Sequence, residues 1–182
     1  MKFKVTPQSI PDVLLIEPTV YADDRGYFQE SYNLNDFEEF LPGVKFVQDN
    51  ESKSSKGVLR GLHFQKAPHA QAKLIRVIQG SIWDVAVDIR PLSPTYMRFC
   101  FAEISADNHF QFFVPRGFAH AFIVTSDMAI VQYKTDNFYH PQSDAGIHPH
   151  DPVLKIPWPL QKEEHLLSEK DILLPKLSTI DL

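Results

Sequence analysis

The sequence predicts an all-β protein, either an antiparallel sandwich, a jelly roll or a barrel, with only a few short helices. Short apolar segments of strand length follow one another between residues 72 and 135, and turn residues such as SADN, PRG and SD separate them. The 14 prolines fit this class better than a helical bundle, because proline interrupts helices and marks the ends of strands.

The individual strands follow from the alternation of side chains. In the clearest one, residues 82–90, large apolar residues alternate with small or acidic ones. The Gln79-Gly80 pair predicts a tight turn that joins this strand to a preceding one at 72–78. Residues 60–65 also form a strand-like stretch, and turn residues between short segments predict further strands at residues 96–104, 109–115, 120–125 and 128–135.

Two short helices are predicted from capping patterns. One covers residues 35–43, with Asn35 as the candidate N-cap, Glu38 three residues later and a Pro-Gly stop. The other covers residues 168–174, with Ser168 as the cap and Asp171 in the matching position. The Pro-rich segment from residue 148 is expected to wrap the barrel, so residues 1–182 should form a single domain.

The composition excludes several classes of protein. With a net charge of −5 over 182 residues, the chain lacks the large basic face of a protein that coats nucleic acid. No apolar run approaches the ~20 residues that span a bilayer, and the polar N-terminal MKFKVTPQSI does not suit a signal peptide. Cys100 is the only cysteine, which excludes an intrachain disulfide and a cysteine zinc ribbon. We therefore expect a cytoplasmic protein with neither a nucleic-acid nor a membrane partner.

His63, in the segment RGLHFQ, has three interpretations: a metal ligand, a catalytic base or a structural histidine. Cupin metal sites combine a His-x-His pair with a later Pro-x-Gly-x-x-His segment, and the second part is present here as PRGFAH, residues 115–120. Gln65 stands where the second histidine of the pair belongs, so we expect no metal site on the usual positions. A metal could then be held only by recruiting His69 or His109.

A structural histidine bonded to a backbone carbonyl is the ordinary interpretation of such a residue. The neighbourhood favours a functional one, because polar groups that converge in a barrel interior indicate a cavity. The polar residues on or beside predicted strands are Arg60, Lys73, Asp84, His120 and Tyr133. Strict alternation puts Arg60 and His63 on opposite faces, so a shared site requires a bulge near Gly61.

Segments in the same order and spacing, between about residues 11 and 171, resemble the dTDP-4-dehydrorhamnose 3,5-epimerase family. They are DDRGYFQESYN, FVQDN, SKGVLRGLHFQ, AQAKLIRVIQG, WDVAVDIRPLSPT, VPRGFAHAFIV, YKTDNFY and LLSEKD. The resemblance implies a cupin-type double-stranded β-helix, or jelly roll, that works as a homodimer without metal or other cofactor. The polar N-terminus would suit a strand exchanged between subunits. The implied substrate is dTDP-4-dehydro-6-deoxy-glucose, inverted at C3 and C5 to the precursor of L-rhamnose.

The resemblance also assigns catalytic roles. Epimerisation beside a ketone needs a base on one face, an acid on the other and a cation at the enolate oxygen. These roles fall to His63 as base, Tyr133 as acid and Lys73 as cation, and a histidine side chain ordinarily titrates near ~6.5, which suits a base. Asp171 resembles the partner that orients His63. On the residues alone, Asp171 is a helix-capping acid, and Asp84 is a weaker alternative partner.

Further positions match family contacts with the nucleotide sugar. Arginine suits the pyrophosphate because its planar fork makes paired bonds, and Tyr139 resembles the aromatic residue that stacks on thymine. Taken singly, each of these residues also fits a turn, an edge or a core position. The expected substrate-binding residues are Arg25, Glu30, Gln48, Asp49, Asn50, Arg60, Lys73, His120, Tyr139, Asp144 and Lys170.

The chain departs from the family pattern near the expected nucleotide site. Asp144 replaces a common glutamate, and IHPHDP replaces a segment that usually contains tryptophan. Three alternatives stay open: an epimerase that acts at a single position, a non-catalytic cupin that senses a sugar nucleotide, and a metal-dependent cupin. Solvent exchange at the sugar carbons separates the first two from a double epimerase, and metal analysis tests the third.

Overall fold

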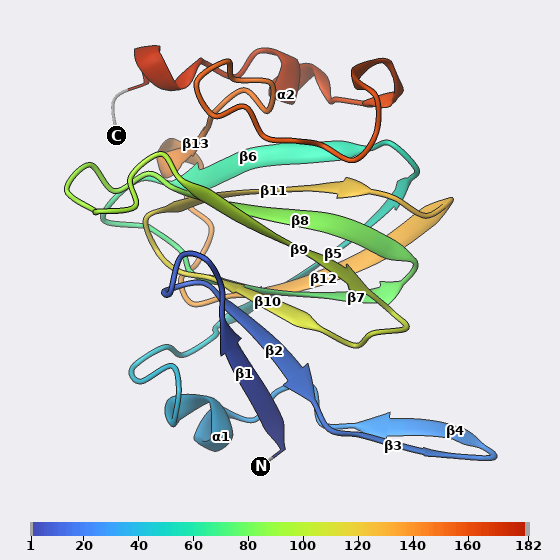
Figure 1. The fold of residues 1–182 in the computed structure, drawn as a ribbon. Coiled ribbons are helices and arrows are strands. Elements are labelled where there is room, and N and C mark those ends of the chain that lie inside the picture. Colours follow the sequence, from blue (N-terminus) through green and yellow to red (C-terminus); the bar gives the residue numbers. More distant parts are fainter. Residues whose placement is uncertain (1, 181–182) are drawn as a thin grey trace.

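The computed structural model describes residues 2–180 and contains two antiparallel sheets that face each other, as expected for a jelly roll (Figure 1). The larger sheet has the strand order β1-β2-β10-β7-β12-β5. Its strands are β1 (Phe3–Pro7), β2 (Leu14–Pro18), β10 (Gln111–Val114), β7 (Lys73–Gln79), β12 (Met128–Thr135) and β5 (Gln48–Ser55).

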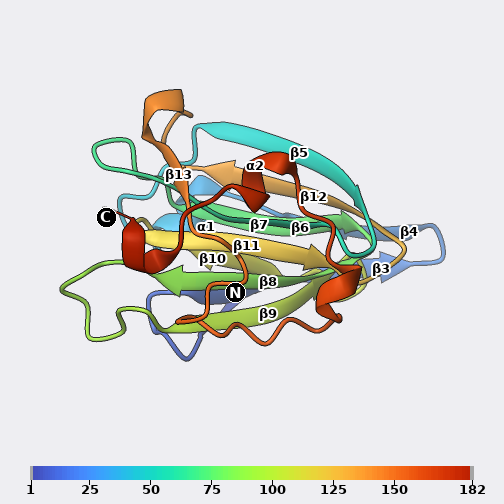
Figure 2. The ribbon, with the colours of Figure 1, turned by 90° about the horizontal axis from the view of Figure 1, so that it is seen from above.

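The smaller sheet has the order β13-β6-β11-β8-β9. Its strands are β13 (Asp144–Gly146), β6 (Leu59–Gln65), β11 (Phe118–Val124), β8 (Ser81–Asp88) and β9 (Phe99–Ser105). A separate hairpin of β3 (Val20–Asp23) and β4 (Gly26–Gln29) projects beyond both sheets in two perpendicular views (Figures 1 and 2).

The helices are short, as the sequence predicts. They are α1 (Leu34–Glu38), α2 (Glu169–Ile172) and the 3₁₀ turns η1 (Pro141–Ser143), η2 (Lys162–Glu164) and η3 (Leu177–Thr179). None of the helices within residues 2–180 is long and apolar enough to cross a membrane.

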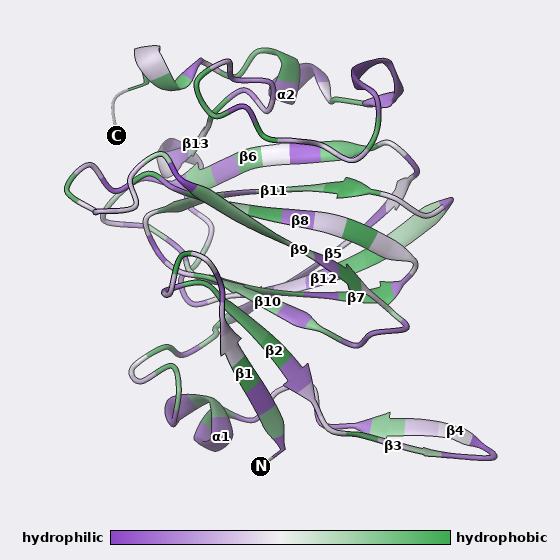
Figure 3. Ribbon diagram, viewed as in Figure 1, coloured by the Kyte–Doolittle hydropathy of each residue, from purple (hydrophilic) through white to green (hydrophobic). Residues whose placement is uncertain are grey.

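The alternation along β8 separates two apolar cores. Ala86 belongs to the cluster between the sheets, whereas Val85 and Val87 belong to a second cluster on the outer face of the smaller sheet. Leu154 and Ile156 of the C-terminal segment cover that second cluster. The Pro-rich tail therefore wraps the sheet, as expected, and it carries α2 to the rim of the barrel (Figures 2 and 3).

The predicted strand at 128–135 coincides with β12, and the strands predicted on either side of the Gln79-Gly80 turn match β7 and β8 to within two residues. The start of the first helix was predicted incorrectly. Its N-cap is Asn33, whose side chain accepts from the Asn35 backbone nitrogen, and not Asn35 itself. Ser168 caps α2 as predicted.

The expected bulge near Gly61 is confirmed. On paired strands, His63 lies opposite His120, but Arg60 lies opposite Phe122, so β6 contains one extra residue. Gly61 has φ +113°, and a Cβ there would lie 2.4 Å from the backbone oxygen of His120. The bulge lets Arg60 and His63 both point between the sheets, where the Arg60 Nε donates to Ser54 Oγ of β5 at 3.1 Å.

Candidate active site

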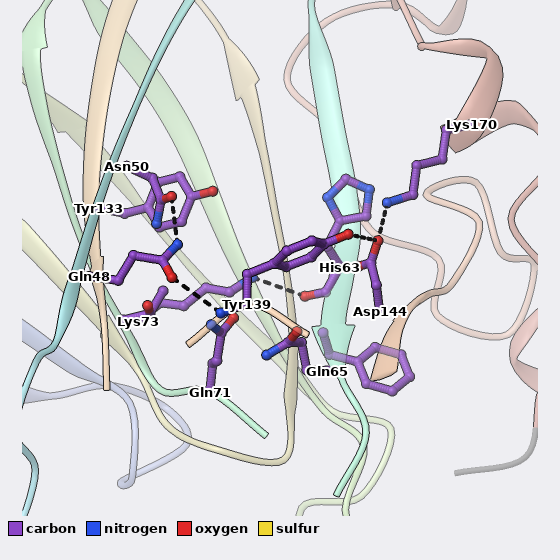
Figure 4. Close-up of a pocket in the computed structure, with 12 residues that line it drawn as sticks. Gln48, Asn50, His63, Gln65, Gln71, Lys73, Tyr133, Tyr139, Asp144 and Lys170 are labelled. Atoms are coloured by element: carbon purple, nitrogen blue, oxygen red, sulfur yellow. Dashed lines mark hydrogen bonds and ion pairs between the residues drawn. The ribbon is translucent and has the colours of Figure 1, made fainter. Parts of the chain in front are cut away.

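A pocket of about 310 Å³ opens between the two sheets at the end of the barrel nearest α2 (Figure 4). Side chains of β5, β7 and β12 form one wall, and those of β6 form the other. The lining residues are Gln48, Asn50, His63, Phe64, Gln65, Gln71, Lys73, Tyr133, Thr135, Tyr139, Asp144 and Lys170.

His63 and Tyr133 face the pocket from opposite sheets (Figure 4). His63 belongs to β6 of the smaller sheet, and Tyr133 belongs to β12 of the larger one. Lys73, the first residue of β7, reaches across, and its Nζ donates to the backbone oxygen of His63 at 3.2 Å. An imidazole, a phenol and an ammonium group therefore border the same space.

Asp171 does not line the pocket itself but contacts the His63 ring. Its Oδ1 lies 2.5 Å from the His63 Nε2, and its side chain is only 4% exposed. Burial is the largest single influence on Asp171 and raises its pKa, but the hydrogen bond and charge of His63, the hydrogen bond from Ser168 and the charge of Lys170 together outweigh it, so the pKa is lower than its ordinary value. The carboxylate therefore stays charged at neutral pH and can stabilise a protonated imidazole.

Burial changes the pKa values of Lys73 and Tyr133 in opposite directions, because it disfavours the charged form of each side chain. It lowers the pKa of Lys73 to about 8, although the charges of Asp84 and Asp144 act against this shift. It raises the pKa of Tyr133, which the nearby Arg60 guanidinium partly offsets. At neutral pH Lys73 is a cation and Tyr133 a neutral phenol, which are the forms that a cation at an oxygen and a proton donor require.

A second set of polar side chains, those of Tyr139, Asp144 and Lys170, lies at the mouth of the pocket. The hydroxyl of Tyr139 donates to Asp144 Oδ2 at 3.1 Å, and the ammonium of Lys170 pairs with the same carboxylate oxygen. This hydrogen bond raises the pKa of Lys170. Because Lys170 precedes Asp171 on α2, the mouth of the pocket and the His63 partner are linked through the same helix.

Several predicted binding residues lie outside this pocket. His120 is buried on β11 beside His63, where its Nε2 lies 2.7 Å from Asp84 Oδ1, so Asp84 is a partner of His120 and not of His63. Asp49 lies on the opposite face of β5 from its neighbours in the pocket, and it pairs with Lys134 at 2.8 Å. Arg60 lies at the edge, close to Tyr133 and bonded to Ser54.

Arg25 and Glu30 are even farther from the pocket of their own chain. Arg25 is at the tip of the projecting hairpin, where it pairs with Asp23, and Glu30 follows the hairpin and pairs with Lys2 at 2.9 Å. The structure of one chain therefore does not bring these two residues to the pocket.

The pocket also contains residues that the sequence analysis did not assign to it, namely Phe64, Gln65, Gln71 and Thr135. Gln65 could have been found, because it lies two residues after His63 on a strand and so shares its face. Gln71 lies in a loop, where no pattern indicated its position. Within residues 2–180, no group of three or more His, Cys, Asp or Glu side chains is arranged to hold a metal ion.

Comparisons with known proteins agree with this architecture. Residues 7–179 match the family model described as dTDP-4-dehydrorhamnose 3,5-epimerase. The enzyme of that name from Escherichia coli (strain K12) is 52% identical over 94% of this chain and 91% of its own length.

Solved structures give the same result. The 3,5-epimerase of Legionella pneumophila Philadelphia 1, in complex with dTDP-4-keto-L-rhamnose, has a TM-score of 0.94 at 45% identity, covering 98% of this chain and 95% of that one. The epimerase of Elizabethkingia anophelis NUHP1 has a TM-score of 0.92 at 49% identity, covering 98% of each chain. These similarities confirm the cupin-type jelly roll, and the chain belongs to the dTDP-4-dehydrorhamnose 3,5-epimerase family.

Proposed function

We propose that this isomerase inverts C3 and C5 of dTDP-4-dehydro-6-deoxy-α-D-glucose to give dTDP-4-dehydro-β-L-rhamnose, a step toward dTDP-L-rhamnose. The observation that supports this function most directly is the placement of His63 and Tyr133 on opposite walls of one pocket, with the Lys73 ammonium between the sheets. The reaction moves protons only, so it needs no redox cofactor.

Each inversion follows the same two steps. The neutral imidazole of His63 takes the proton from the carbon beside the C4 ketone, and the C–H electron pair forms the enolate. The Lys73 ammonium stabilises the negative charge that develops on the ketone oxygen. The Tyr133 phenol then donates its proton to the opposite face of the same carbon, which inverts it, and proton exchange with solvent restores both groups.

Asp171 has a supporting role in this proposal. A charged carboxylate 2.5 Å from Nε2 fixes the orientation of the His63 ring and stabilises the imidazolium formed in the first step. The opposite ring nitrogen is then free to act on the substrate. The tail segment thus supplies a group without which the base would be weaker and less well oriented.

The nucleotide would lie at the mouth of the pocket. Tyr139 is 53% exposed there, and its ring offers a flat apolar face to thymine. The cations of Lys170 and Arg60 would attract the pyrophosphate, and Gln48 and Asn50 line the pocket. Asp49 and His120 keep their predicted binding roles only if the bound state differs from this arrangement of their side chains.

We also propose a homodimer, because it explains the hairpin. Its exposed aromatic residues are Tyr21 at 62%, Tyr27 at 59% and Phe28 at 68% exposure, which suits a surface that a second subunit covers. In that arrangement, Arg25 and Glu30 would serve the pocket of the partner and not that of their own chain. The cytoplasmic location remains a prediction from composition.

The test counts the hydrogens of the sugar that exchange with solvent. The enzyme is incubated with dTDP-4-dehydro-6-deoxy-glucose in heavy water, and the product is analysed by NMR. We expect deuterium at both C3 and C5, and none from a His63→Asn variant. Deuterium at a single carbon would identify a single-position epimerase, and tight thymidine diphosphate binding without any exchange would identify a sugar-nucleotide sensor.

A further inference from the structure

Glutamine side chains hold the loop that carries Tyr139. This loop, residues 137–140, follows β12 and lines the mouth of the pocket. The Gln71 Nε2 donates to the backbone oxygen of Asn137 at 2.7 Å, and the Gln65 Nε2 donates to that of Phe138 at 3.2 Å. The backbone nitrogen of Tyr139 donates to Gln48 Oε1 at 3.1 Å, and that of His140 donates to Gln65 Oε1 at 2.6 Å.

These glutamines come from separate parts of the fold. Gln48 begins β5 of the larger sheet, Gln65 ends β6 of the smaller sheet, and Gln71 lies in the loop before β7. Together their hydrogen bonds tie the consecutive loop residues 137–140 to both walls of the barrel. The three glutamine side chains are labelled at the pocket in Figure 4. We call Gln48, Gln65 and Gln71 the glutamine cradle.

A carboxamide is suited to this task because it donates and accepts at the same time. Gln65 uses both ends: its nitrogen also donates to the backbone oxygen of His69 at 2.8 Å, and its side chain is buried. In Gln48, the nitrogen donates to Asn50 Oδ1 at 2.9 Å while the oxygen holds Tyr139. These polar atoms are engaged by the protein itself, although the side chains border the pocket.

Gln65 stands at a position where metal-binding cupins have a ligand. It occupies the place of the second histidine in the cupin His-x-His pair, on the same face of β6 as His63. A histidine there could not donate to two carbonyls and accept from an amide as the carboxamide does. The replacement turns a position typical of a metal ligand into one that orders the nucleotide end of the pocket.

We propose that the glutamine cradle positions the Tyr139 ring and thereby determines the affinity for the thymine nucleotide, while leaving the proton transfers at His63 and Tyr133 unchanged. The three glutamines are positioning residues and not catalytic ones. The inference rests on the proposed function for the identity of the ligand. The order that the cradle imposes on the loop does not depend on that function.

The test compares Gln65→Met with Gln142→Met. Gln142 is an exposed residue of the adjacent η1 turn and belongs to neither the cradle nor the pocket. Losing the three Gln65 hydrogen bonds should weaken thymidine diphosphate binding about tenfold by calorimetry. KM for the sugar nucleotide should rise by a similar factor, and kcat should stay within about twofold. Hydrogen exchange of the ligand-free protein should be faster at the His140 amide, and Gln142→Met should match the wild type in all three measurements.

A double-mutant cycle shows whether Gln65 acts through Tyr139. In a Tyr139→Ala background, Gln65→Met should cause little further loss of thymidine diphosphate affinity. Equal losses in both backgrounds, or a fall in kcat at constant KM, would overturn the proposal. If Gln65→Met does not fold, Gln71→Met, which removes only the bond to Asn137, is measured in the same way. If the wild type exchanges no hydrogen of the substrate with solvent, the proposed function is wrong. If the amide of His140 exchanges at the wild-type rate in Gln65→Met, the glutamine cradle does not order the loop, and the present proposal is wrong.

Discussion

The Asp171 Oδ1 lies 2.5 Å from the His63 Nε2, although the two residues are 108 positions apart in the chain. The backbone nitrogen of Asp171 meanwhile donates to Ser168 Oγ at 3.1 Å. The helix-cap interpretation and the catalytic-partner interpretation of Asp171 are therefore compatible, because the cap uses its backbone and His63 uses its side chain. A cap at Ser168 fixes the short helix that presents the carboxylate.

The first prediction separates these two contacts. Asp171→Asn should lower kcat about 100-fold or more, because an amide cannot stabilise the imidazolium. The variant should keep its far-UV circular dichroism spectrum. Ser168→Ala should instead cost about 1 kcal/mol of folding free energy, measured by urea unfolding, with a smaller effect on kcat. A near-normal rate for Asp171→Asn would leave Asp171 a purely structural role.

The second prediction concerns the proposed acid. Tyr133→Phe keeps the ring but removes the proton that the proposed mechanism delivers to the carbon, so net epimerisation should fall about 100-fold or more. His63 can still remove a proton and return one to the same face. Deuterium should therefore enter the recovered substrate without inversion, which NMR in heavy water detects. Retained epimerisation in this variant would mean that another group is the acid.

The third prediction follows from the pKa of Lys73, which burial lowers to about 8. The charged ammonium is the form that stabilises an enolate, so kcat/KM should be fully developed below this pH and should fall as the pH rises through about 8. Tyr133 does not account for such a limb, because burial raises its pKa. A pH profile measured with the wild type tests this, and an alkaline limb first seen above pH ~10, the ordinary range of lysine, would contradict it.

Lys73→Met tests the role of the same ammonium by removing it. It should abolish most of the activity, by about 100-fold or more. It should also stabilise the fold, because the folded state holds a cation whose pKa is depressed relative to the unfolded chain. The loss of folding free energy caused by burying the ammonium is therefore complete below about pH 8, the pKa of Lys73 in the folded state. It disappears above 10.5, the ordinary pKa of lysine. At pH 7 the gain should be about 1–3 kcal/mol in urea unfolding.

Turn residues and one structural constraint explain what the sequence could predict. The segment 128–135 is a strand-length run that follows the turn residues Ser126-Asp127, and it coincides with β12. The bulge at Gly61 was predictable because a site that includes both Arg60 and His63 cannot form on a regular strand. Glycine was the residue able to take the required backbone conformation, with φ +113°.

Contacts between distant segments were beyond such reasoning. Asn33 and Asn35 are equally good caps by residue type, and the helix that begins after Asn33 buries Phe37, whose ring centroid lies 5.0 Å from that of Phe3 in β1. The bonds of Gln65 depend on where the loop after β12 turns back, which no local pattern specifies. The pairing of Asp84 with His120 likewise depends on how β8 and β11 align across the sheet.

The fourth prediction tests the bulge by adding a methyl group. Gly61→Ala places a Cβ 2.4 Å from the His120 backbone oxygen, so the paired strands must separate. We expect a loss of about 3 kcal/mol or more of unfolding free energy. Gly43→Ala is the matched control, because Gly43 also has a positive φ of +78° but its Cβ would meet nothing within 4 Å. It should cost only about 1 kcal/mol. Equal losses would show that backbone strain alone matters at Gly61.

The fifth prediction asks which subunit Arg25 serves. Arg25 bonds only to Asp23 of its own hairpin among the residues described, and the hairpin projects away from the sheets. If a dimer brings this hairpin to the partner's pocket, Arg25→Ala and His63→Ala should each be nearly inactive as homodimers. A heterodimer of the two variants would contain one pocket with both wild-type residues and one with neither.

Co-expression of the two variants with different affinity tags tests this arrangement directly. Random pairing makes about half of the dimers heterodimers, and each has one complete pocket, so the mixture should recover about a quarter of the wild-type activity. Purified heterodimer should recover about half. If Arg25 instead served the pocket of its own chain, each pocket of the heterodimer would lack one of the two residues, and no activity would return. Mixing Arg25→Ala with Arg25→Ala that carries the second tag controls for an effect of the tags, and it should remain inactive in either case.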